Sequence, residues 1–408
     1  MGKQVSQLRQ VREGLAFAPT EQATSFGGIA DRWLALLETA QRALQEQAAQ
    51  TAEIPQVYVA GSALRPDQAG GLFKGRVDLF RQLEALMLRP VHPTLLLYGG
   101  RRTGKTSTLN YLPYRLDGNL IPLLVDLQAM GALLTWKGFV RELVDQISES
   151  ARGGRNLHLP PLDQAWLEED PFVALRRWMD AVEKTSGART LLLCLDEYER
   201  LDEFATHIGN QAPFHFLRHV MQHRPRWTLL FAGAHFPDEL PTHWSDYLIN
   251  TQAVRVSALS EADSRDLILH PMPDFPPIYA PETVDGIWKL TRGHPYLIQL
   301  LCNELVDRLN REKRKLALPT DIEDVLPAVF DRGGQFFREF WELTLTPAQQ
   351  QLLAALAQQH PLPAPSSADL EILRRKEFVV VQHGLYGFQT PLLRRWVEWR
   401  LQRDDEFA

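Results

Sequence analysis

The feature that most constrains this chain is an apolar run that leads into a glycine-rich loop and then a helix-compatible segment. The run and loop read TLLLYGGRRTGKTS over residues 94–107, and the loop matches G-x-x-x-x-G-K-[ST] from Gly99 to Thr106. Glycines permit backbone angles that a Cβ would obstruct, so successive N–H groups can point inward at an anion. The positive N-terminal end of the following helix faces the same anion. The segment therefore predicts a phosphate-binding loop, or P-loop.

Each position of this P-loop has an expected role. Lys105 is expected to reach the β- and γ-phosphates of a nucleotide and to take part in catalysis, and Thr106 is expected to ligate Mg²⁺. The other positions expected to bind nucleotide are Gly99, Gly100, Arg101, Arg102, Thr103, Gly104 and Ser107. The alternative is a glycine-rich turn beside a surface lysine. The apolar run before the loop and the helix-compatible segment after it favour the phosphate-binding interpretation.

The composition indicates a globular chain with material for two or three domains. Its 408 residues carry a formal net charge of −6, which gives no global attraction to nucleic acid or to an anionic membrane, although a local basic face remains open. The two cysteines, Cys194 and Cys302, cannot form a disulfide framework and fit a reducing compartment. The N-terminus lacks the apolar region of a signal peptide, and no run approaches the ~18 apolar residues of a spanning helix. We therefore expect a cytoplasmic protein with no membrane partner.

Apolar runs alternate with helical patterns between residues 94 and 257. The runs lie at 94–98, 120–125, 190–195 and 227–232, with a weaker one near 253–256, and helical stretches include 135–150, 171–185 and 213–223. This alternation predicts βαβ units around a parallel sheet. The runs are continuous rather than alternating, which is typical of a sheet covered on both faces. The expected fold class is α/β, with a parallel P-loop sheet flanked by helices.

Helical patterns flank this core on both sides. Residues 1–52 show an apolar stripe at three- and four-residue steps, which predicts an N-terminal helical region. Further helices are predicted at 283–292, 295–314, 320–330, 333–344, 347–359 and 366–376, followed by a hairpin over 378–388 and a helix over 391–402. Helix, helix, hairpin and helix form the outline of a winged helix. The expected domains after residue 52 are a P-loop core (53–258), an all-helical lid (259–344) and a C-terminal winged helix (345–408).

A second strand end supplies the acidic residues that a P-loop requires. In TLLLCLDE at 190–197, Asp196 is expected to hold the Mg²⁺ shell, and Glu197 is expected to be the general base that activates water. The next apolar run leads to Ala234, which is not polar, and to His235, which is expected to contact the γ-phosphate as a catalytic sensor. Plainer roles stay open: the acidic pair as the cap of a following helix, and His235 as a loop histidine.

Several elements occur in a characteristic order. They are Phe73-Lys-Gly-Arg76, the P-loop, Leu-Asp-Glu at 195–197, Phe-Ala-Gly at 231–233 and Gly293-His-Pro295. In this order the chain resembles the STAND class of signal-transduction P-loop ATPases and, more narrowly, the bacterial and archaeal AAA-like ATPases whose helical domain carries Gly-x-Pro. The resemblance covers roughly residues 55–400. It implies a nucleotide-binding core, a helical lid and a winged helix, with ATP or ADP and Mg²⁺ as cofactors.

The resemblance also implies further site residues and a function. By position, Tyr58 to Gly61 and Arg76 would border the adenine, and Gly293, His294 and Pro295 would close over the nucleotide from the lid. The Gly-His-Pro element is also typical of a helix C-cap followed by a proline-started helix, and both interpretations can hold. The implied function is a slow, ATP-hydrolysing switch in signalling or defence. It would act through a protein partner or effector, with self-association on ATP binding.

A basic C-terminal segment keeps a second function open. Its cations are interleaved with Trp396 and Trp399 and comprise Arg374, Arg375, Lys376, Arg394, Arg395, Arg400 and Arg403. A winged helix could lay such a face on DNA phosphates, as in AAA+ ATPases that act as loaders or transposition helpers. The alternative is that the arginine-flanked aromatic stripe packs against a neighbouring domain.

Two other groups of side chains have open roles. Arg218, Arg224 and Arg226 could act across a subunit boundary or be ordinary solvated arginines. Three histidines at four-residue steps, at positions 215, 219 and 223, fit either a metal site or a polar helix face.

Overall fold

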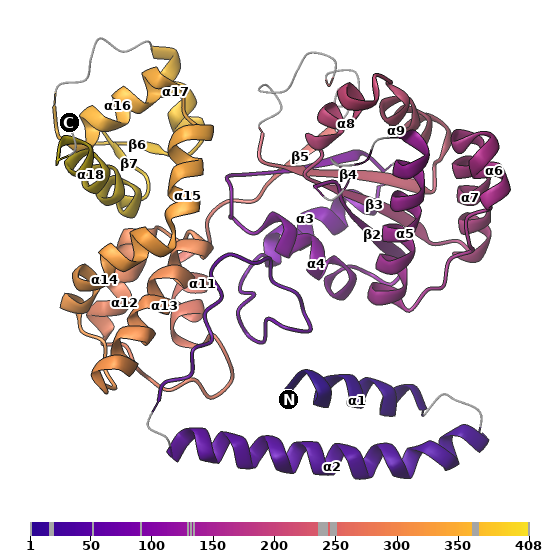
Figure 1. Ribbon diagram of the computed structural model, residues 1–408, viewed down its shortest axis with the longest axis horizontal. Coiled ribbons are helices and arrows are strands. Elements are labelled where there is room, and N and C mark those ends of the chain that lie inside the picture. The colour runs from indigo at the N-terminus through magenta and orange to yellow at the C-terminus, as the bar shows by residue number, and fades with distance from the viewer. Residues whose placement is uncertain are drawn as a thin grey trace.

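The computed structural model of the chain has an α/β core, a helical region beside it, a C-terminal unit packed on that region, and a separate pair of N-terminal helices (Figure 1). The structure describes residues 2–15, 20–50, 53–89, 92–128, 130, 133, 135–235, 244, 251–360 and 367–406. No helix among these residues is both long enough and apolar enough to cross a bilayer.

The core contains a five-stranded sheet in the order β2-β3-β4-β1-β5, with every pairing parallel. Its strands are β1 (Thr94–Tyr98), β2 (Leu120–Asp126), β3 (Thr190–Asp196), β4 (Trp227–Gly233) and β5 (Thr251–Arg255). The predicted α/β parallel sheet is confirmed, and each strand begins within two residues of its predicted start. The register pairs Asp196 with Ala232, and Tyr98 with Gly233. The ends of β1, β3 and β4 therefore meet at one edge of the sheet.

Both faces of the sheet are covered by helices. In β3, Leu193 and Leu195 join one apolar cluster, whereas Leu192 and Cys194 join the other. One face carries α3 (Val77–Met87) and α4 (Lys105–Arg115). The other face carries α5 (Trp136–Arg155), α7 (Pro171–Thr185), α8 (Arg200–Ile208) and α9 (Ala212–His223), with α6 (Gln164–Glu169) beside α7. Burial on both faces explains why the strands are continuous apolar runs.

The helical region and the C-terminal unit follow in the predicted order. The helical region comprises α11 (Glu261–Leu269), α12 (Pro281–Thr291), α13 (Pro295–Glu312), α14 (Pro319–Arg332), α15 (Gly334–Arg338) and a π-helical turn, η4 (Glu339–Leu343). The C-terminal unit comprises α16 (Pro347–Ala357), α17 (Ser367–Arg375), the antiparallel hairpin β6 (Val379–Gln382) and β7 (Leu385–Phe388), and α18 (Pro391–Glu406). The expected single helix over 333–344 is instead an α-helical turn that continues into the π-helical turn.

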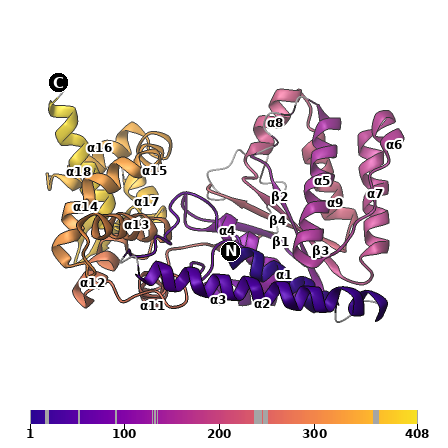
Figure 2. The same cartoon turned by 60° about the horizontal axis from the view of Figure 1, so that its bottom comes forward.

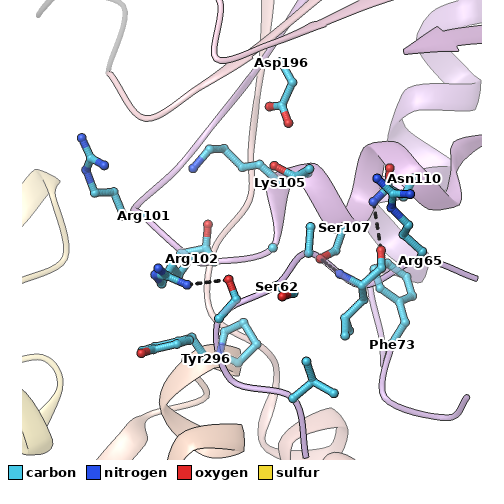
Figure 3. A pocket seen from close by; sticks show the side chains of 18 of the residues that line it. Ser62, Arg65, Phe73, Arg101, Arg102, Lys105, Ser107, Asn110, Asp196 and Tyr296 are labelled. Carbon is cyan, nitrogen blue, oxygen red and sulfur yellow. Dashed lines mark hydrogen bonds between the residues drawn. The ribbon is translucent and has the colours of Figure 1, made fainter. Parts of the chain in front are cut away.

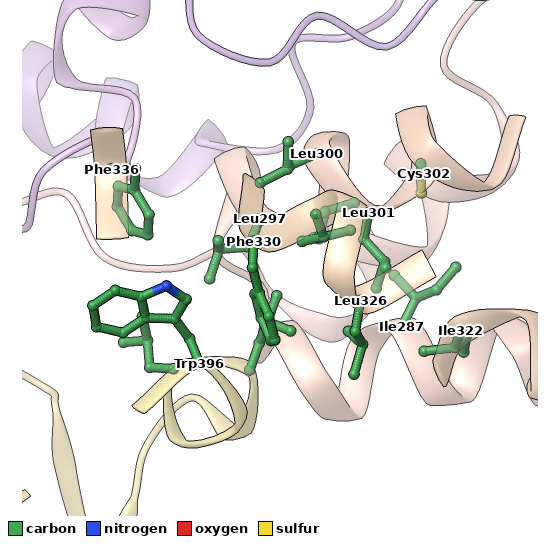
Figure 4. Close-up of a cluster of buried hydrophobic side chains, with 14 of the residues drawn as sticks. Ile287, Leu297, Leu300, Leu301, Cys302, Ile322, Leu326, Phe330, Phe336 and Trp396 are labelled. Atoms are coloured by element: carbon green, nitrogen blue, oxygen red, sulfur yellow. The ribbon is translucent and has the colours of Figure 1, made fainter. Parts of the chain in front are cut away.

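One continuous hydrophobic cluster joins these two parts. Figure 4 shows Trp396 of α18 facing the side chains of α13 and α14, and the Trp396 ring stacks on Phe337 with centroids 5.3 Å apart. Ile54 and Leu72 also belong to this cluster, whereas Phe73 stacks on Tyr111 of α4, so the segment before α3 packs on both the helical region and the core. The helical region and the C-terminal unit therefore share their apolar core.

The basic C-terminal segment is occupied by contacts within the chain. Arg400 lies 5.8 Å from the Trp396 ring centroid, and Arg403 lies 4.6 Å from that of Trp399. Arg395 forms an ion pair of 3.0 Å with Glu323 of α14. The structure therefore agrees with the second interpretation, in which the arginine-flanked aromatic stripe packs against a neighbouring part of the chain.

The N-terminal helices, α1 (Gly2–Leu15) and α2 (Thr20–Gln50), form an antiparallel pair that lies along the molecule (Figure 2). Ion pairs hold them together: Arg9 with Glu38 at 2.7 Å, and Arg12 with Asp31 at 2.5 Å. Residues 2–15 and 20–50 are thus helical, as the apolar stripe predicted.

Candidate functional site

A cavity of about 520 Å³ lies where the carboxyl edge of the sheet faces the helical region (Figure 3). We call it the P-loop cavity. Its walls come from the loop between β1 and α4, the end of β3, the segment 59–65, and the helical region. The helical region contributes Pro295, Tyr296, Gln299, Gln335 and Glu339. Most of the residues that the sequence predicted for one site are therefore brought together.

The backbone of the P-loop has the shape that an anion cradle requires. A Cβ at Gly99 would lie 2.3 Å from the carbonyl oxygen of Val256, so only glycine permits this close approach. Gly104 has φ of 100° and immediately precedes α4, whose first residue is Lys105. The N-terminal end of α4 therefore opens onto the cavity, where its dipole and free N–H groups favour an anion.

Lys105 is a buried ammonium group at the centre of this loop. Its Nζ donates to the carbonyl oxygens of Gly99 at 3.0 Å and Gly100 at 2.9 Å, and the residue is 7% exposed. Burial lowers the pKa of Lys105, while the nearby Glu197 and Asp196 carboxyls oppose this shift. A desolvated cation of this kind gains from an anionic ligand that supplies stronger acceptors than carbonyl oxygens.

Asp196 and Thr106 form the pair that a hard metal ion would need. The Thr106 hydroxyl hydrogen-bonds to the Asp196 carboxyl, which is 3% exposed. Burial raises the pKa of Asp196 to about 6, because the ionised form loses its water. Hydroxyl and carboxylate oxygens suit Mg²⁺, which keeps several waters and phosphate ligands. Among the described residues no cluster of three or more His, Cys, Asp or Glu could hold a metal, so the histidines of α9 form no such cluster.

Glu197 follows Asp196 and also lines the P-loop cavity. Its φ of 53° places it in the left-handed region, which is unusual for a glutamate and turns the chain sharply after β3. Burial and the neighbouring Glu199 raise the pKa of Glu197. A carboxylate with a raised pKa inside a cleft suits a proton acceptor.

Glu199 is a site residue that the sequence reasoning missed. Its Oε1 accepts hydrogen bonds from the backbone N–H groups of Ala234 at 2.8 Å and His235 at 3.1 Å. It also lies 3.0 Å from the Nδ1 of His235. Although burial alone would raise the pKa of Glu199, hydrogen bonds from His235 outweigh it and lower the pKa. Glu199 therefore connects the turn after β3 to the end of β4, and the repeated acid in Asp-Glu-Tyr-Glu was the available signal.

The structure corrects the expected place of His235. Ala234 lines the P-loop cavity, whereas His235 lines a different cavity on the other side of the loop. The contact with Glu199 holds the imidazole against the chain after β3.

One wall of the P-loop cavity is formed by the segment 61–65 and the residues packed on it. The Ser107 hydroxyl accepts from the Leu64 N–H at 3.0 Å, and Asn110 donates to the Leu64 carbonyl at 3.0 Å (Figure 3). The Gly61 carbonyl accepts from Arg102 at 2.9 Å. This wall is thus tied directly to the P-loop and to α4.

Tyr58 lies elsewhere, which corrects its expected contact with adenine. Its ring belongs to the cluster of the helical region, and its hydroxyl donates to the Ile268 carbonyl at 2.6 Å. The side chain does not line the P-loop cavity, whereas Gly61, at the other end of the expected segment, does.

Arg76 lines the P-loop cavity and links two backbone segments. It donates to the Thr103 carbonyl at 2.7 Å and to the Ser257 carbonyl at 2.6 Å. Burial lowers the pKa of Arg76 to about 10, so it stays cationic at neutral pH. Arg76 therefore holds the P-loop against the chain that connects β5 to the helical region.

The Gly-His-Pro element forms the contact between the helical region and the P-loop. Gly293 has φ of 80°, its carbonyl accepts from the Leu259 N–H at 2.8 Å, and a Cβ there would lie 2.2 Å from the Leu259 oxygen. Pro295 starts α13 and lines the P-loop cavity, as expected. The sequence expectation that this element caps one helix and starts the next is confirmed.

His294 occupies a position that differs from the expected one. It does not line the P-loop cavity but the cavity behind the loop, where its ring meets the backbone of Arg101. Burial lowers the pKa of His294 to about 4, so the imidazole is neutral at physiological pH. The helical region reaches the P-loop cavity instead through Tyr296, whose ring centroid lies 4.8 Å from the Arg102 guanidinium.

The arginines considered for action across a subunit boundary do not line the P-loop cavity. Arg224 forms ion pairs with Asp180 and Glu183 of α7. Arg226 donates to the Glu183 carbonyl at 2.7 Å. Arg224 and Arg226 precede β4, so they lie at the edge of the sheet opposite the site.

Comparisons with known proteins identify the fold. No family model matches the sequence, and no curated protein matches it. Among solved structures, a Walker-type ATPase of Pyrococcus abyssi matches with a TM-score of 0.59 and 18% identity over 84% of this chain and 99% of its own. Cdc6p of Pyrobaculum aerophilum matches with a TM-score of 0.42 and 16% identity over 85% and 98%. ORC1 of Aeropyrum pernix, solved in complex with DNA, matches with a TM-score of 0.44 and 16% identity over 83% and 95%.

The fold is therefore that of a Walker-type P-loop ATPase, and the site has the loop, lysine and acidic strand end of that class. The likeness spans nearly the whole of the Pyrococcus abyssi chain, so it includes the parts that follow the sheet as well as the sheet itself.

Proposed function

We propose that the chain is an ATP-hydrolysing molecular switch of the STAND and AAA-like type. The helical region acts as a lid (259–344), and the C-terminal unit is a winged helix (345–408). The observation that carries the proposal is that the P-loop contacts the lid through its own arginines. Arg102 packs on Tyr296, and Arg101 pairs with Glu339 at 3.4 Å. A nucleotide on the loop would therefore meet core and lid together.

The residues present fit ATP and Mg²⁺. Gly99 to Ser107 would hold the phosphates, Thr106 and Asp196 would hold the metal ion, and Gly61, Arg76 and Pro295 would border the remainder of the nucleotide. Held by Thr106 and Asp196, Mg²⁺ would supply positive charge that stabilises the charge developing during phosphoryl transfer. The buried, cationic Lys105 supplies the complementary charge from the protein.

Glu197 would accept the proton of the attacking water. Its raised pKa makes it a stronger base than a solvated glutamate, and its place in the P-loop cavity puts it beside Asp196. Glu199 positions the adjoining backbone by holding the end of β4 through Ala234 and His235. Lys105 orients the phosphate that is attacked.

The switch would rest on a difference in contacts between nucleotide states. Arg101 and Glu339 both line the P-loop cavity and pair with one another. A γ-phosphate placed there competes with Glu339 for Arg101 and repels the Glu339 carboxylate. Loss of that phosphate on hydrolysis restores the pair, so ATP and ADP favour different arrangements of core and lid.

The same proposal includes a protein partner or effector, in signalling or defence, and self-association on ATP binding. The partner interaction is supported by apolar side chains of α2 that stand in solvent: Phe26, Ile29, Trp33 and Leu36 are each 53–57% exposed. Exposed apolar residues gathered on one element are typical of an interaction surface.

The test is ATP binding and turnover in the wild type and in Lys105→Ala. We expect the variant to lose about 100-fold or more in ATP affinity, because a buried charge-assisted contact to the phosphates is removed. Lys289→Gln is the matched control, since Lys289 is an exposed cation of α12 outside the cavity. Undiminished binding and turnover in Lys105→Ala would contradict the proposal.

The alternative function is a DNA-engaged AAA+ ATPase that uses the winged helix. The helix, helix, hairpin and helix order of the C-terminal unit supports it. Its cations support it less, because Arg374, Arg394 and Arg395 all form ion pairs within the chain. A salt-dependent affinity for duplex DNA would favour this alternative. Absence of binding at low salt would remove it.

A further inference from the structure

A second cavity, of about 270 Å³, lies on the reverse side of the P-loop. We call it the rear cavity. It is built where three parts of the chain meet: Gly100 and Arg101 come from the core, Arg292 and His294 from the helical region, and Thr390 from the C-terminal unit. Of the described residues that line these cavities, only Arg101, Thr103 and Ala234 line both. The rear cavity is therefore a separate space that shares one wall with the P-loop cavity.

The body of the rear cavity is aromatic and apolar. Phe336 and Phe340 line it and are 6% and 4% exposed, and Phe378 and the buried Leu393 line it from the C-terminal unit. Leu343 also lines it, yet its side chain is 70% exposed, so apolar surface extends into solvent there. Phe340 and Leu343 belong to the π-helical turn, a rare element that is frequent at functional sites. These walls suit the apolar part of a small molecule.

The polar groups of the rear cavity favour an anion. Arg292 and Lys376 both line it, with the Lys376 Nζ 3.5 Å from the Thr344 carbonyl oxygen, and its carboxylate, Glu377, is paired with Arg255 at 3.1 Å. The Nδ1 of His294 is buried and has no hydrogen-bond partner among the described residues. Buried polar atoms are almost always paired, so an orphaned ring nitrogen in an apolar cavity indicates a missing hydrogen-bonding group.

We propose that the rear cavity binds a small anionic molecule with an aromatic body. The aromatic body packs against Phe336, Phe340 and Phe378, the anionic group meets Arg292 and Lys376, and a polar atom pairs with His294. Such a ligand touches core, helical region and C-terminal unit at once and stabilises their present arrangement. This inference goes beyond the proposed function, because binding at this cavity requires neither ATP binding nor hydrolysis.

Together with the nucleotide binding proposed above, on which this step rests, the shared wall makes the rear cavity a regulatory site. A ligand there contacts Gly100 and Arg101, while a nucleotide contacts the opposite side of the same loop. A molecule that favours one arrangement of the three parts changes nucleotide affinity, and nucleotide changes the affinity of that molecule by the same factor. Because Lys376 and Thr390 belong to the C-terminal unit and line the rear cavity, a change in what the P-loop binds can alter the contacts of that unit.

The test uses the fluorescent dye 8-anilinonaphthalene-1-sulfonate, an aromatic anion, with the full chain. We expect saturable binding of about one dye per chain and about tenfold weaker binding by the Arg292→Gln/Lys376→Gln double variant. N-phenyl-1-naphthylamine, which has the same rings without the sulfonate, should bind both proteins equally. Lys289→Gln, which changes a cation outside the cavity, should bind the dye like the wild type.

Two further variants complete the test: one changes the rear cavity, and the other is expected to lose ATP binding. Leu343→Glu places an anion at an exposed lining position, so the protein should fold normally and bind the dye more weakly. Lys105→Ala should still bind the dye, which separates this inference from the proposed ATPase. Dye binding that is unchanged in both cavity variants would overturn the inference. Dye that ATP displaces one for one from the wild type, with no loss in the double variant, belongs to the P-loop cavity and would also overturn it.

Discussion

The two sides of the P-loop differ in their chemistry although they share one backbone. The phosphate side, which faces the P-loop cavity, gathers Lys105, Asp196 and Glu197 in a charged cleft. The reverse side, which faces the rear cavity, meets His294 and a group of phenylalanines. The first arrangement suits a reaction that moves charge. The second suits packing and small-molecule binding between parts of the chain. The difference shows how one loop can serve catalysis on one side and contact the helical region on the other.

The largest expected effect lies on the phosphate side, at Glu197. We predict that Glu197→Gln lowers ATP turnover by about 10²- to 10⁴-fold, because the amide cannot accept the proton of water. ATP affinity should change by less than about threefold, since the amide keeps the size of the side chain. Single-turnover kinetics and equilibrium binding separate the two quantities. Turnover equal to that of the wild type would mean that another residue accepts the proton. It would also remove the chemical difference that we draw between the two sides of the P-loop.

Where the helical region contacts the P-loop, the strongest effect is expected at Gly293. Gly293→Ala forces a Cβ toward the Leu259 oxygen and imposes a strained positive φ, so we predict a loss of about 1–3 kcal/mol in the free energy of unfolding. Gly334→Ala is the matched control in the same region, because a Cβ there meets nothing within 4 Å. Thermal unfolding of both variants measures the difference. Equal stability would mean that the contact between Gly293 and Leu259 is not tight.

We expect ATP turnover to depend on pH through a group on the phosphate side and not through His294 on the reverse side. The pKa of Asp196 is raised to about 6, so its carboxyl is ionised above that pH and takes a proton below it. A neutral carboxyl would no longer hold the Mg²⁺ proposed for this site, so we predict that turnover falls about tenfold between pH 7 and pH 5. His294, with its pKa lowered to about 4, stays neutral throughout this range. A pH–rate profile with melting curves as the control checks the prediction, and a flat profile would contradict it.

The smallest expected effect concerns the ion pair between Arg101 of the core and Glu339 of the helical region. Arg101 and Glu339 lie partly in solvent, so their pairing contributes less than about 1 kcal/mol. We predict opposite signs for ATP affinity: Arg101→Gln weakens it and Glu339→Gln strengthens it, each by about two- to fivefold. Equilibrium binding of ATP measures both. Changes of the same sign would indicate that the pair acts only through the stability of the contact.

Features encoded in consecutive residues were predictable from the sequence. The strands appear as apolar runs because each is buried on both faces, and Asp196 and Glu197 reach the P-loop because parallel strands end at one edge of the sheet. Lys105, Asp196 and Glu197 followed from these local signals and line the P-loop cavity, whereas Pro295, which also lines it, was implied by the resemblance to AAA-like ATPases.

Features that depend on distant partners were not predictable. Tyr58 bonds to Ile268, which lies 210 positions later, and no local pattern indicates that partner. His294 and His235 line the rear cavity instead of the P-loop cavity, because contacts with Arg101 and Glu199 hold their rings there. The rear cavity combines three separate parts of the chain, so only their packing reveals it.

The most direct test of the proposed switch is a distance between the core and the C-terminal unit. Both native cysteines, Cys194 and Cys302, are 0% exposed, so fluorophores can be attached to cysteines introduced at the exposed positions Glu169 and Gln382. We predict that energy transfer between them differs between ATP and ADP in a Glu197→Gln background, and that Lys105→Ala abolishes this difference. Identical energy transfer with ATP, ADP and no nucleotide, in a protein that binds ATP, would contradict the switch.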